Sequence, residues 1–189
     1  MEYTKTLGRV SSAQLSIKGQ LLAALAAAGM AVALPRLVHA LGVFTGLGTG
    51  LGELLLPMHL PVMLVGFAAG PWAGVVAGLL APVVSYLLSG MPLAAILPFM
   101  VVELAVYGFA AGWLKNRALP MVAKVVVVQL AGRAVRGVAI LAGFYLLQTT
   151  VAPAVIYTSI AAGWLGIVLQ WAALPALAKW TERLANHED

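Results

Sequence analysis

Three ionisable residues interrupt long apolar runs of this sequence: Glu103, Arg133 and Arg136. A charged side chain at the centre of a membrane span costs about 2.5–3.5 kcal/mol or more, unless it faces a cavity or a partner. Arginine beside glutamate can recognise an anion, because a guanidinium binds a carboxylate through two parallel hydrogen bonds. The alternative is a structural ion pair between Glu103 and Arg133, which would leave Arg136 without an acidic partner.

The elements that position these charges must be membrane helices. Of the 189 residues, 62% are hydrophobic and only 9% are charged, which lies outside the range of soluble domains. Leu54 to Val102 is a run of 49 residues without a formal charge, enough for two spans and a turn. The apolar runs are continuous, whereas barrel strands alternate apolar and polar residues, so helices are expected.

The sequence predicts a single transmembrane domain over residues 1–189, an all-α bundle of six helices bounded by proline and glycine breakers. The expected spans are Lys18 to Leu34, Leu54 to Ala69, Pro71 to Leu88, Ala94 to Leu114, Met121 to Leu146 and Pro153 to Ala178.

Basic residues set the expected orientation. With six spans both termini share one side, and eight of the 11 lysines and arginines then lie there, which predicts cytoplasmic termini. Residues 1–17 form a short cytoplasmic segment in this scheme and make a poor signal peptide. The net charge of +5 therefore reflects topology, and nucleic-acid binding has little support.

The three buried charges are expected to lie at one depth. Glu103 is about eight residues from the outer end of its span, roughly 12 Å deep at the helical rise. Arg133, counted from the opposite end of its span, falls at nearly the same level in a core about 30 Å thick. Arg136 is one turn further out on the same face. This arrangement predicts a polar pocket in the outer half of the membrane.

Five other residues are candidates for the same pocket. We expect His59, Tyr107, Tyr86 and Trp164 to surround a small ligand, and Gln129 to form its floor. Each has a simpler interpretation: an interfacial or capping histidine, an aromatic belt residue for Tyr86, a lipid-facing Trp164, and interhelical hydrogen bonding for Gln129.

The connection over residues 36–53 is rich in glycine, including Gly46, Gly48, Gly50 and Gly52. Glycine permits many backbone conformations, so we interpret this segment as a lid over an outward-facing pocket. A passive loop packed on the outer surface is the alternative. The spacing does not fit a nucleotide-binding loop.

Ala23, Ala27 and Ala31 recur every four residues and give the first span a nearly flat face. Such a face predicts close helix packing, either within this chain or against a separate membrane subunit. The sequence contains no phosphate-binding loop, no metal-ligand motif, no cysteine and no nucleophile with an evident base, so we assign no metal, no cofactor and no catalytic residues.

Nearly the whole chain resembles the substrate-binding S components of energy-coupling factor (ECF) vitamin transporters. The resemblance is carried by the alanine-rich first helix, by Pro57-Met58-His59, Gly70-Pro71 and Gly90-Met91-Pro92, and by "VVELAVYGFAAGWL" with Glu103 and Tyr107. It implies a six-helix binding subunit of the bacterial cytoplasmic membrane that captures a vitamin from outside. It also implies docking, through Ala23, Ala27 and Ala31, on a transmembrane coupling subunit driven by two cytoplasmic ATPases.

Two arginines against one glutamate favour an anionic solute, and among vitamins handled by such subunits pantothenate is our first choice. Folate, a pyridoxine-type compound and a queuosine precursor remain alternatives, the last because Glu103 could bind an amine. The competing classes are a small membrane-embedded enzyme and a channel.

Overall fold

The computed structural model describes residues 15–48 and 50–185, and all regular structure in those residues is α-helical. Most of the predicted cytoplasmic segment 1–17 lies outside the described residues. The helices are α1 (Ile17–Thr45), α2 (Gly50–Leu55), α3 (His59–Ala69), α4 (Pro71–Ser89), α5 (Leu97–Leu114), α6 (Met121–Leu146), α7 (Ala154–Ala162) and α8 (Trp164–Ala185).

Five stretches of the described chain are long and apolar enough to cross a membrane, and one of them is α2 together with α3. Helices α7 and α8 supply a sixth when they are taken as one span, bent by 55°. The prediction of an all-α membrane protein is thus confirmed, with five candidate spans in the described residues, or six when the bent pair is counted as one. The side of the membrane on which the termini lie stays a prediction.

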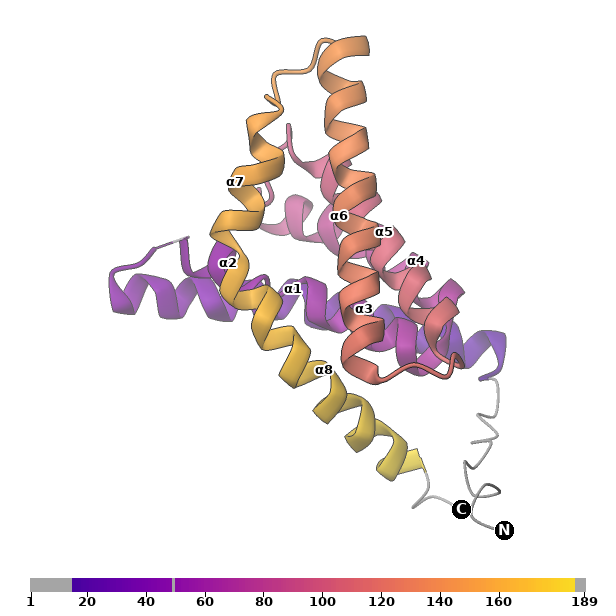
Figure 1. Cartoon of the computed structure of the whole chain (residues 1–189). Coiled ribbons are helices and arrows are strands. Elements are labelled where there is room, and N and C mark those ends of the chain that lie inside the picture. Colours follow the sequence, from indigo (N-terminus) through magenta and orange to yellow (C-terminus); the bar gives the residue numbers. More distant parts are fainter. Residues whose placement is uncertain (1–14, 49, 186–189) are drawn as a thin grey trace.

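Helix α5 is the centre of the bundle. It contacts α3, α4 and α6, and α1 packs across α3 and α4 (Figure 1). Glycines allow the closest of these contacts: a Cβ atom on Gly74 of α4 would collide with the backbone of Gly108 of α5, and the reverse also holds. Small residues let helix backbones approach and gain dispersion energy, which replaces the hydrophobic effect inside a membrane.

The alanine face of α1 belongs to this core. Ala27 is 2% exposed and Ala31 is 0% exposed, and both lie in the cluster that joins α1 to α3 and α4, while Ala23 packs against it partly buried. Of the two alternatives, packing within this chain or against a separate subunit, the structure shows the first for this face. Ala27 and Ala31 are thus buried within this chain, and docking of α1 on a second subunit stays a prediction.

The first helix is longer than predicted. Pro35 was expected to end it, but α1 continues to Thr45 with Pro35 buried inside it. Proline removes only one backbone hydrogen bond, and membrane helices tolerate this when neighbours pack around the site. The predicted glycine-rich loop over 36–53 is therefore wrong as a loop: the last residues of α1 and most of α2 occupy it. Between the end of α1 at Thr45 and the start of α2 at Gly50, Gly46 and Gly48 have positive φ.

The last span is also not the continuous helix that was predicted. It breaks at Gly163, where Leu56 of the α2–α3 connection packs against it. Figure 1 shows α7 and α8 meeting at an angle. A Cβ atom on Gly163 would lie 2.8 Å from the Leu56 side chain, and one on Gly166 would lie 2.5 Å from the Leu55 backbone. The bend thus lies where the end of α2 and the α2–α3 connection pack against the last span.

Candidate ligand-binding site

The polar centre of the molecule begins with Glu103 and Tyr107, which are one helical turn apart on α5. Glu103 is 0% exposed and Tyr107 is 1% exposed. The Tyr107 hydroxyl donates to Oε1 of Glu103 over 3.1 Å. The Tyr107 ring lies against Gly132 of α6, where any side chain would overlap it. Gly132 therefore lets α6 approach α5 closely enough for the arginines of α6 to reach Glu103.

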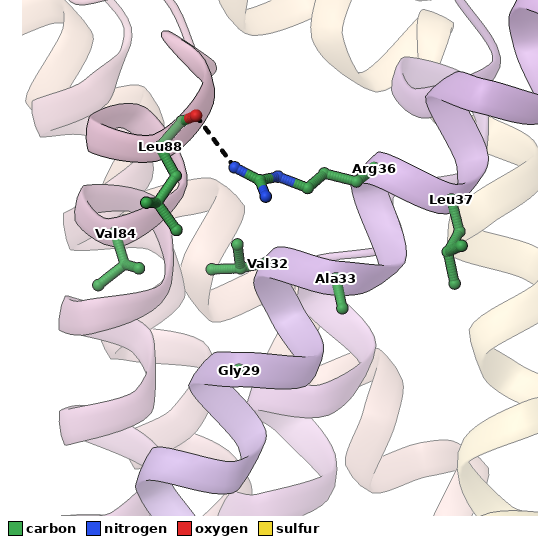
Figure 2. A pocket seen from close by; sticks show the side chains of 7 residues that line it. All are labelled: Gly29, Val32, Ala33, Arg36, Leu37, Val84 and Leu88. Atoms are coloured by element: carbon green, nitrogen blue, oxygen red, sulfur yellow. Dashed lines mark hydrogen bonds between the residues drawn. The ribbon is translucent and has the colours of Figure 1, made fainter.

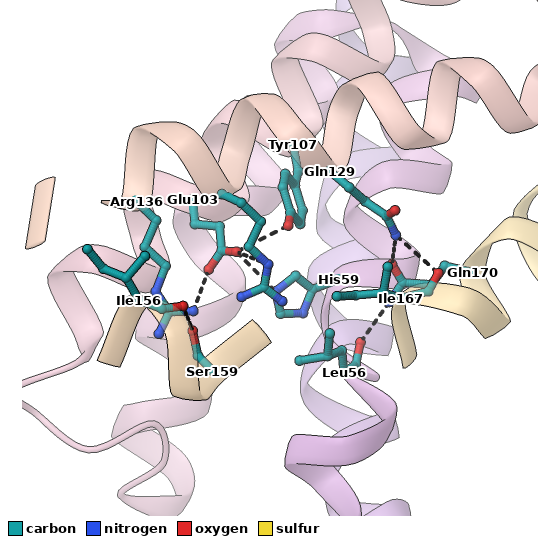
Figure 3. Close-up of polar contacts among 11 residues, drawn as sticks. Leu56, His59, Glu103, Tyr107, Gln129, Arg136, Ile156, Ser159, Ile167 and Gln170 are labelled. Carbon is teal, nitrogen blue, oxygen red and sulfur yellow. Dashed lines mark hydrogen bonds and ion pairs between the residues drawn. The ribbon is translucent and has the colours of Figure 1, made fainter. Parts of the chain in front are cut away.

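Arg133 and Arg136 both approach the Glu103 carboxylate, as the predicted depths require. Nη1 of Arg136 donates to Oε2 over 2.9 Å (Figure 3). Nε of Arg133 lies 3.3 Å from Oε1, as an ion pair. The alternative of a Glu103–Arg133 pair assumed that Arg136 would then lack an acidic partner, but the two oxygens of one carboxylate face both guanidinium groups.

His59 joins this cluster from the first residue of α3. Its side chain is buried, its Nε2 lies 3.9 Å from Oε1 of Glu103, and its ring is tilted against the Tyr107 ring with centroids 5.3 Å apart. Figure 3 shows His59, Tyr107, Glu103 and Arg136 converging from three helices.

Several nitrogen atoms of this cluster have no hydrogen-bond partner within the described residues. They are all three guanidinium nitrogens of Arg133, Nε of Arg136 and both ring nitrogens of His59. A buried polar atom without a partner costs about 1–3 kcal/mol, and more when it is charged, so proteins rarely leave such atoms unpaired. Nitrogens of this kind in a cavity wall are suited to bind a polar molecule.

The cavity beside these nitrogens has a volume of about 690 Å³, which is within the usual range of small-molecule sites. Arg133, Arg136 and His59 line it, together with residues of α1, the α2–α3 connection, the end of α4, the segment before α5, and α7. Its further polar lining comes from Arg36, His39, Glu53, Ser85, Ser89, Thr158 and Ser159. The cavity is thus mainly apolar, with its charges gathered on α6 and at the α1–α2 edge.

Five of the predicted pocket residues are outside the cavity lining: Glu103 and Tyr107 belong to the buried cluster with the arginines, and the other three lie elsewhere. Tyr86 and Trp164 are not in the cavity lining, and Trp164 is 57% exposed, as expected for a lipid-facing side chain. Gln129 forms a separate polar cluster: it donates to Gln170 over 3.0 Å and accepts from Nε1 of Trp171 over 2.7 Å. This is the interhelical hydrogen bonding that was the simpler interpretation of Gln129.

The predicted lid residues are divided in the same way. Gly52 lines the cavity and packs so tightly on His39 that a Cβ atom would lie 2.5 Å from the imidazole ring. Gly46, Gly48 and Gly50 are not in the lining. The element over this side of the cavity is therefore the short helix α2, and its movement as a lid stays a prediction.

The sequence analysis missed the hydroxyl groups of the cavity. Ser85 and Ser89 are one turn apart near the end of α4, and Thr158 and Ser159 are consecutive on α7. Isolated serines and threonines are common in membrane helices, and their sequence signal is weak. The spacing of Ser85 and Ser89 on the face next to Tyr86 was the available indication.

A second hollow of about 560 Å³ lies between α1 and α4, lined by Gly29, Val32, Ala33, Arg36, Leu37, Val84 and Leu88. Arg36 donates to the Leu88 carbonyl there over 3.0 Å (Figure 2). The rest of the lining is apolar, so this groove offers much less polar chemistry than the cavity at Arg133.

A helical bundle with candidate membrane spans and a partly charged cavity defines the class: an integral membrane protein suited to bind a small molecule. The comparisons with known proteins specify it further. Residues 16–178 match the family described as "ECF transporter, substrate-specific component", and the chain belongs to that family. No curated protein and no solved structure gives a significant match. The chain is accordingly a membrane substrate-binding subunit of an ECF transporter, a transport component rather than an enzyme.

Proposed function

We propose that this subunit captures a small, water-soluble, anionic vitamin from outside the cell, with pantothenate as the first candidate. The observation that carries this proposal is Arg133: it lines a 690 Å³ cavity, and its two terminal guanidinium nitrogens have neither a hydrogen bond nor an ion pair within the described residues. A charge-assisted bond to a carboxylate would satisfy them, and arginine is suited to this contact because its planar donor fork matches a carboxylate.

The amine-recognition alternative receives less support. Glu103 is 0% exposed and is not in the cavity lining, and its oxygens face Arg136, Arg133 and the Tyr107 hydroxyl. A queuosine precursor would therefore find no accessible carboxylate at Glu103. Folate and a pyridoxine-type compound remain alternatives to pantothenate that binding experiments can separate.

Membership of the family implies an energy-coupling module as partner. We propose that this module consists of a transmembrane coupling subunit and two cytoplasmic ATPases in a bacterial cytoplasmic membrane. We still propose that α1 docks on the coupling subunit, but through its exposed face and not through the buried alanines. Because Ala27 and Ala31 are buried, the small residues available on α1 are the exposed Ala26, Gly29 and Ala33.

Equilibrium binding of radiolabelled pantothenate to the purified subunit tests the proposed substrate. We expect saturable binding of one molecule per chain, which unlabelled pantothenate displaces and a tenfold excess of pyridoxine does not. Displacement by folate or pyridoxine at lower concentration than by pantothenate would transfer the assignment to that vitamin. Absence of binding by all of these vitamins would contradict the proposed function.

A further inference from the structure

We infer that the ligand carries a single negative charge, and that Arg133 alone binds it while Arg136 is committed to Glu103. This inference rests on the proposed function and specifies its substrate class. It assigns different roles to two arginines that the sequence places on one face of one helix.

The first step is the charge of the cavity. Five formally charged side chains line it or lie directly beneath it: Arg36, Glu53, Arg133, Arg136 and Glu103. Arg36 and Glu53 are exposed residues at the α1–α2 edge, and their charges cancel. Within the described residues the buried group contains two arginines and one glutamate, so one positive charge is uncompensated there.

The second step is the cost of that charge. An isolated ion in a poorly solvated site is expensive unless it is paired, and a ligand with one negative charge removes the imbalance. A second negative charge on the ligand would have no buried partner, since Glu103 already uses one arginine. A cationic ligand would add to the imbalance. The charge of the site thus favours a monoanion over a dianion, a cation or a neutral molecule.

The third step assigns the charge to one arginine. Arg136 donates through Nη1 to Glu103 over 2.9 Å, which is the distance of a strong charge-assisted hydrogen bond. Arg133 approaches the same carboxylate at 3.3 Å without making a hydrogen bond, and both its terminal nitrogens are unpartnered. The Tyr107 hydroxyl bond further holds Glu103 in place. Within the described residues Arg133 is therefore the guanidinium whose two terminal nitrogens are both buried without a hydrogen-bond partner, and a carboxylate bound in the cavity that Arg133 lines would supply one.

The remaining lining specifies the neutral part of the ligand. The Ser89 hydroxyl donates to the Ser85 carbonyl over 2.7 Å, and the Ser159 hydroxyl donates to the Ile156 carbonyl over 3.2 Å. Their hydrogens are thus engaged, whereas their oxygen lone pairs can still accept. These hydroxyls suit hydroxyl or amide donors on the ligand. The expected molecule is a monocarboxylate whose uncharged part carries such donors.

A ligand panel of graded charge tests the substrate class. Isothermal titration of the purified full chain would use the monoanions pantothenate, biotin and nicotinate, the neutral pantothenol and riboflavin, the folate dianion and the thiamine cation. We expect the tightest binding from a monoanion, and pantothenol to bind about a hundredfold more weakly than pantothenate if pantothenate is that ligand. Tightest binding of folate, thiamine or a neutral vitamin would overturn the monoanion inference and leave a vitamin-binding subunit. Absence of binding across the panel would refute the proposed function as well.

Two double variants test the assignment to Arg133, with the best-binding monoanion of the panel as probe. Arg133→Gln with Glu103→Gln and Arg136→Gln with Glu103→Gln both remove one arginine and the buried glutamate, so both retain one positive charge. We expect a loss of about a hundredfold or more in the first and less than about tenfold in the second. Equal losses, or the reverse order, would overturn the assignment.

A single variant keeps the test valid if either double variant fails to fold. Arg133→Lys retains the charge but not the planar fork, so it is expected to weaken binding of the same monoanion by about tenfold or more. Parental affinity in Arg133→Lys would contradict a two-nitrogen contact. Size-exclusion chromatography of each variant establishes that the protein is folded before titration.

Discussion

The buried carboxylate of Glu103 offers a demanding test of the site. Its removal should lower the stability of the protein and raise the affinity of the site for anions. In the parental chain Glu103 is 0% exposed and faces Arg136 at 2.9 Å and Arg133 at 3.3 Å. The Glu103→Gln variant keeps the size of the side chain and removes its charge. Two guanidinium groups would then lie in the protein interior without a carboxylate.

The expected loss of stability follows from these contacts. Removing one partner of a buried ion pair costs about 3–5 kcal/mol, because the remaining charge is left uncompensated. A glutamine can still accept one hydrogen bond from Arg136, but its amide group would present donors to the donors of Arg133. We therefore expect a clearly lower melting temperature for Glu103→Gln in detergent.

The same variant should respond more strongly to an anionic ligand. A ligand that binds the folded state stabilises it, and the effect grows with affinity. With two uncompensated arginines in the cavity, pantothenate should raise the melting temperature of Glu103→Gln more than that of the parental chain. Intrinsic tryptophan fluorescence during heating, with and without pantothenate, measures both effects.

Glu53→Gln is the matched control, since it makes the same chemical change at an exposed position in the first turn of α2. Its effect on stability should stay below about 1 kcal/mol, the range for exposed charges. A parental melting temperature in Glu103→Gln, or equal shifts in the two variants, would refute the view that Glu103 neutralises a buried arginine.

Two further predictions concern packing. Ala27→Leu should lower the melting temperature, since inserting a larger side chain into a packed core costs about 1–3 kcal/mol, whereas Ala26→Leu should leave it unchanged and weaken co-purification with the coupling subunit. Similar melting curves for the two variants would contradict the burial of Ala27. Gly108→Ala should likewise destabilise the bundle, because its new methyl group would meet the Gly74 backbone; a parental melting curve would argue against that contact.

The apolar pattern was sufficient to predict a helical membrane protein and to predict that Glu103 and Arg133 lie at the same depth. Runs without charge locate spans because the bilayer core excludes unpaired ions. Counting residues from opposite ends of two spans placed Glu103 and Arg133 at one depth, and the structure has them 3.3 Å apart. The depth of a residue in the membrane follows from its distance along the span, because a helix rises by a constant amount per residue, so it can be estimated from the sequence.

Properties that depend on a neighbour in space were not predictable. A proline usually ends a helix in a soluble protein, but Pro35 is buried inside α1. The sequence does not distinguish Gly163 from the other glycines of the spans. Its role depends on the α2–α3 connection, which packs against it. The alanine face of α1 could equally have met another subunit or this chain, since a flat face is complementary to either. The hydrogen bond between Arg136 and Glu103 depends on where the two side chains end in space, which residue spacing alone does not specify.

Uptake by reconstituted vesicles tests most directly the claim that this chain binds a vitamin for an energy-coupling module without transporting it alone. Vesicles containing only this chain should bind radiolabelled pantothenate and accumulate none against a gradient, with or without ATP. Vesicles that also contain the coupling subunit and both ATPases should accumulate it when ATP is supplied, and Arg133→Gln in that complex should abolish accumulation. ATP-driven accumulation by the chain alone would contradict the account.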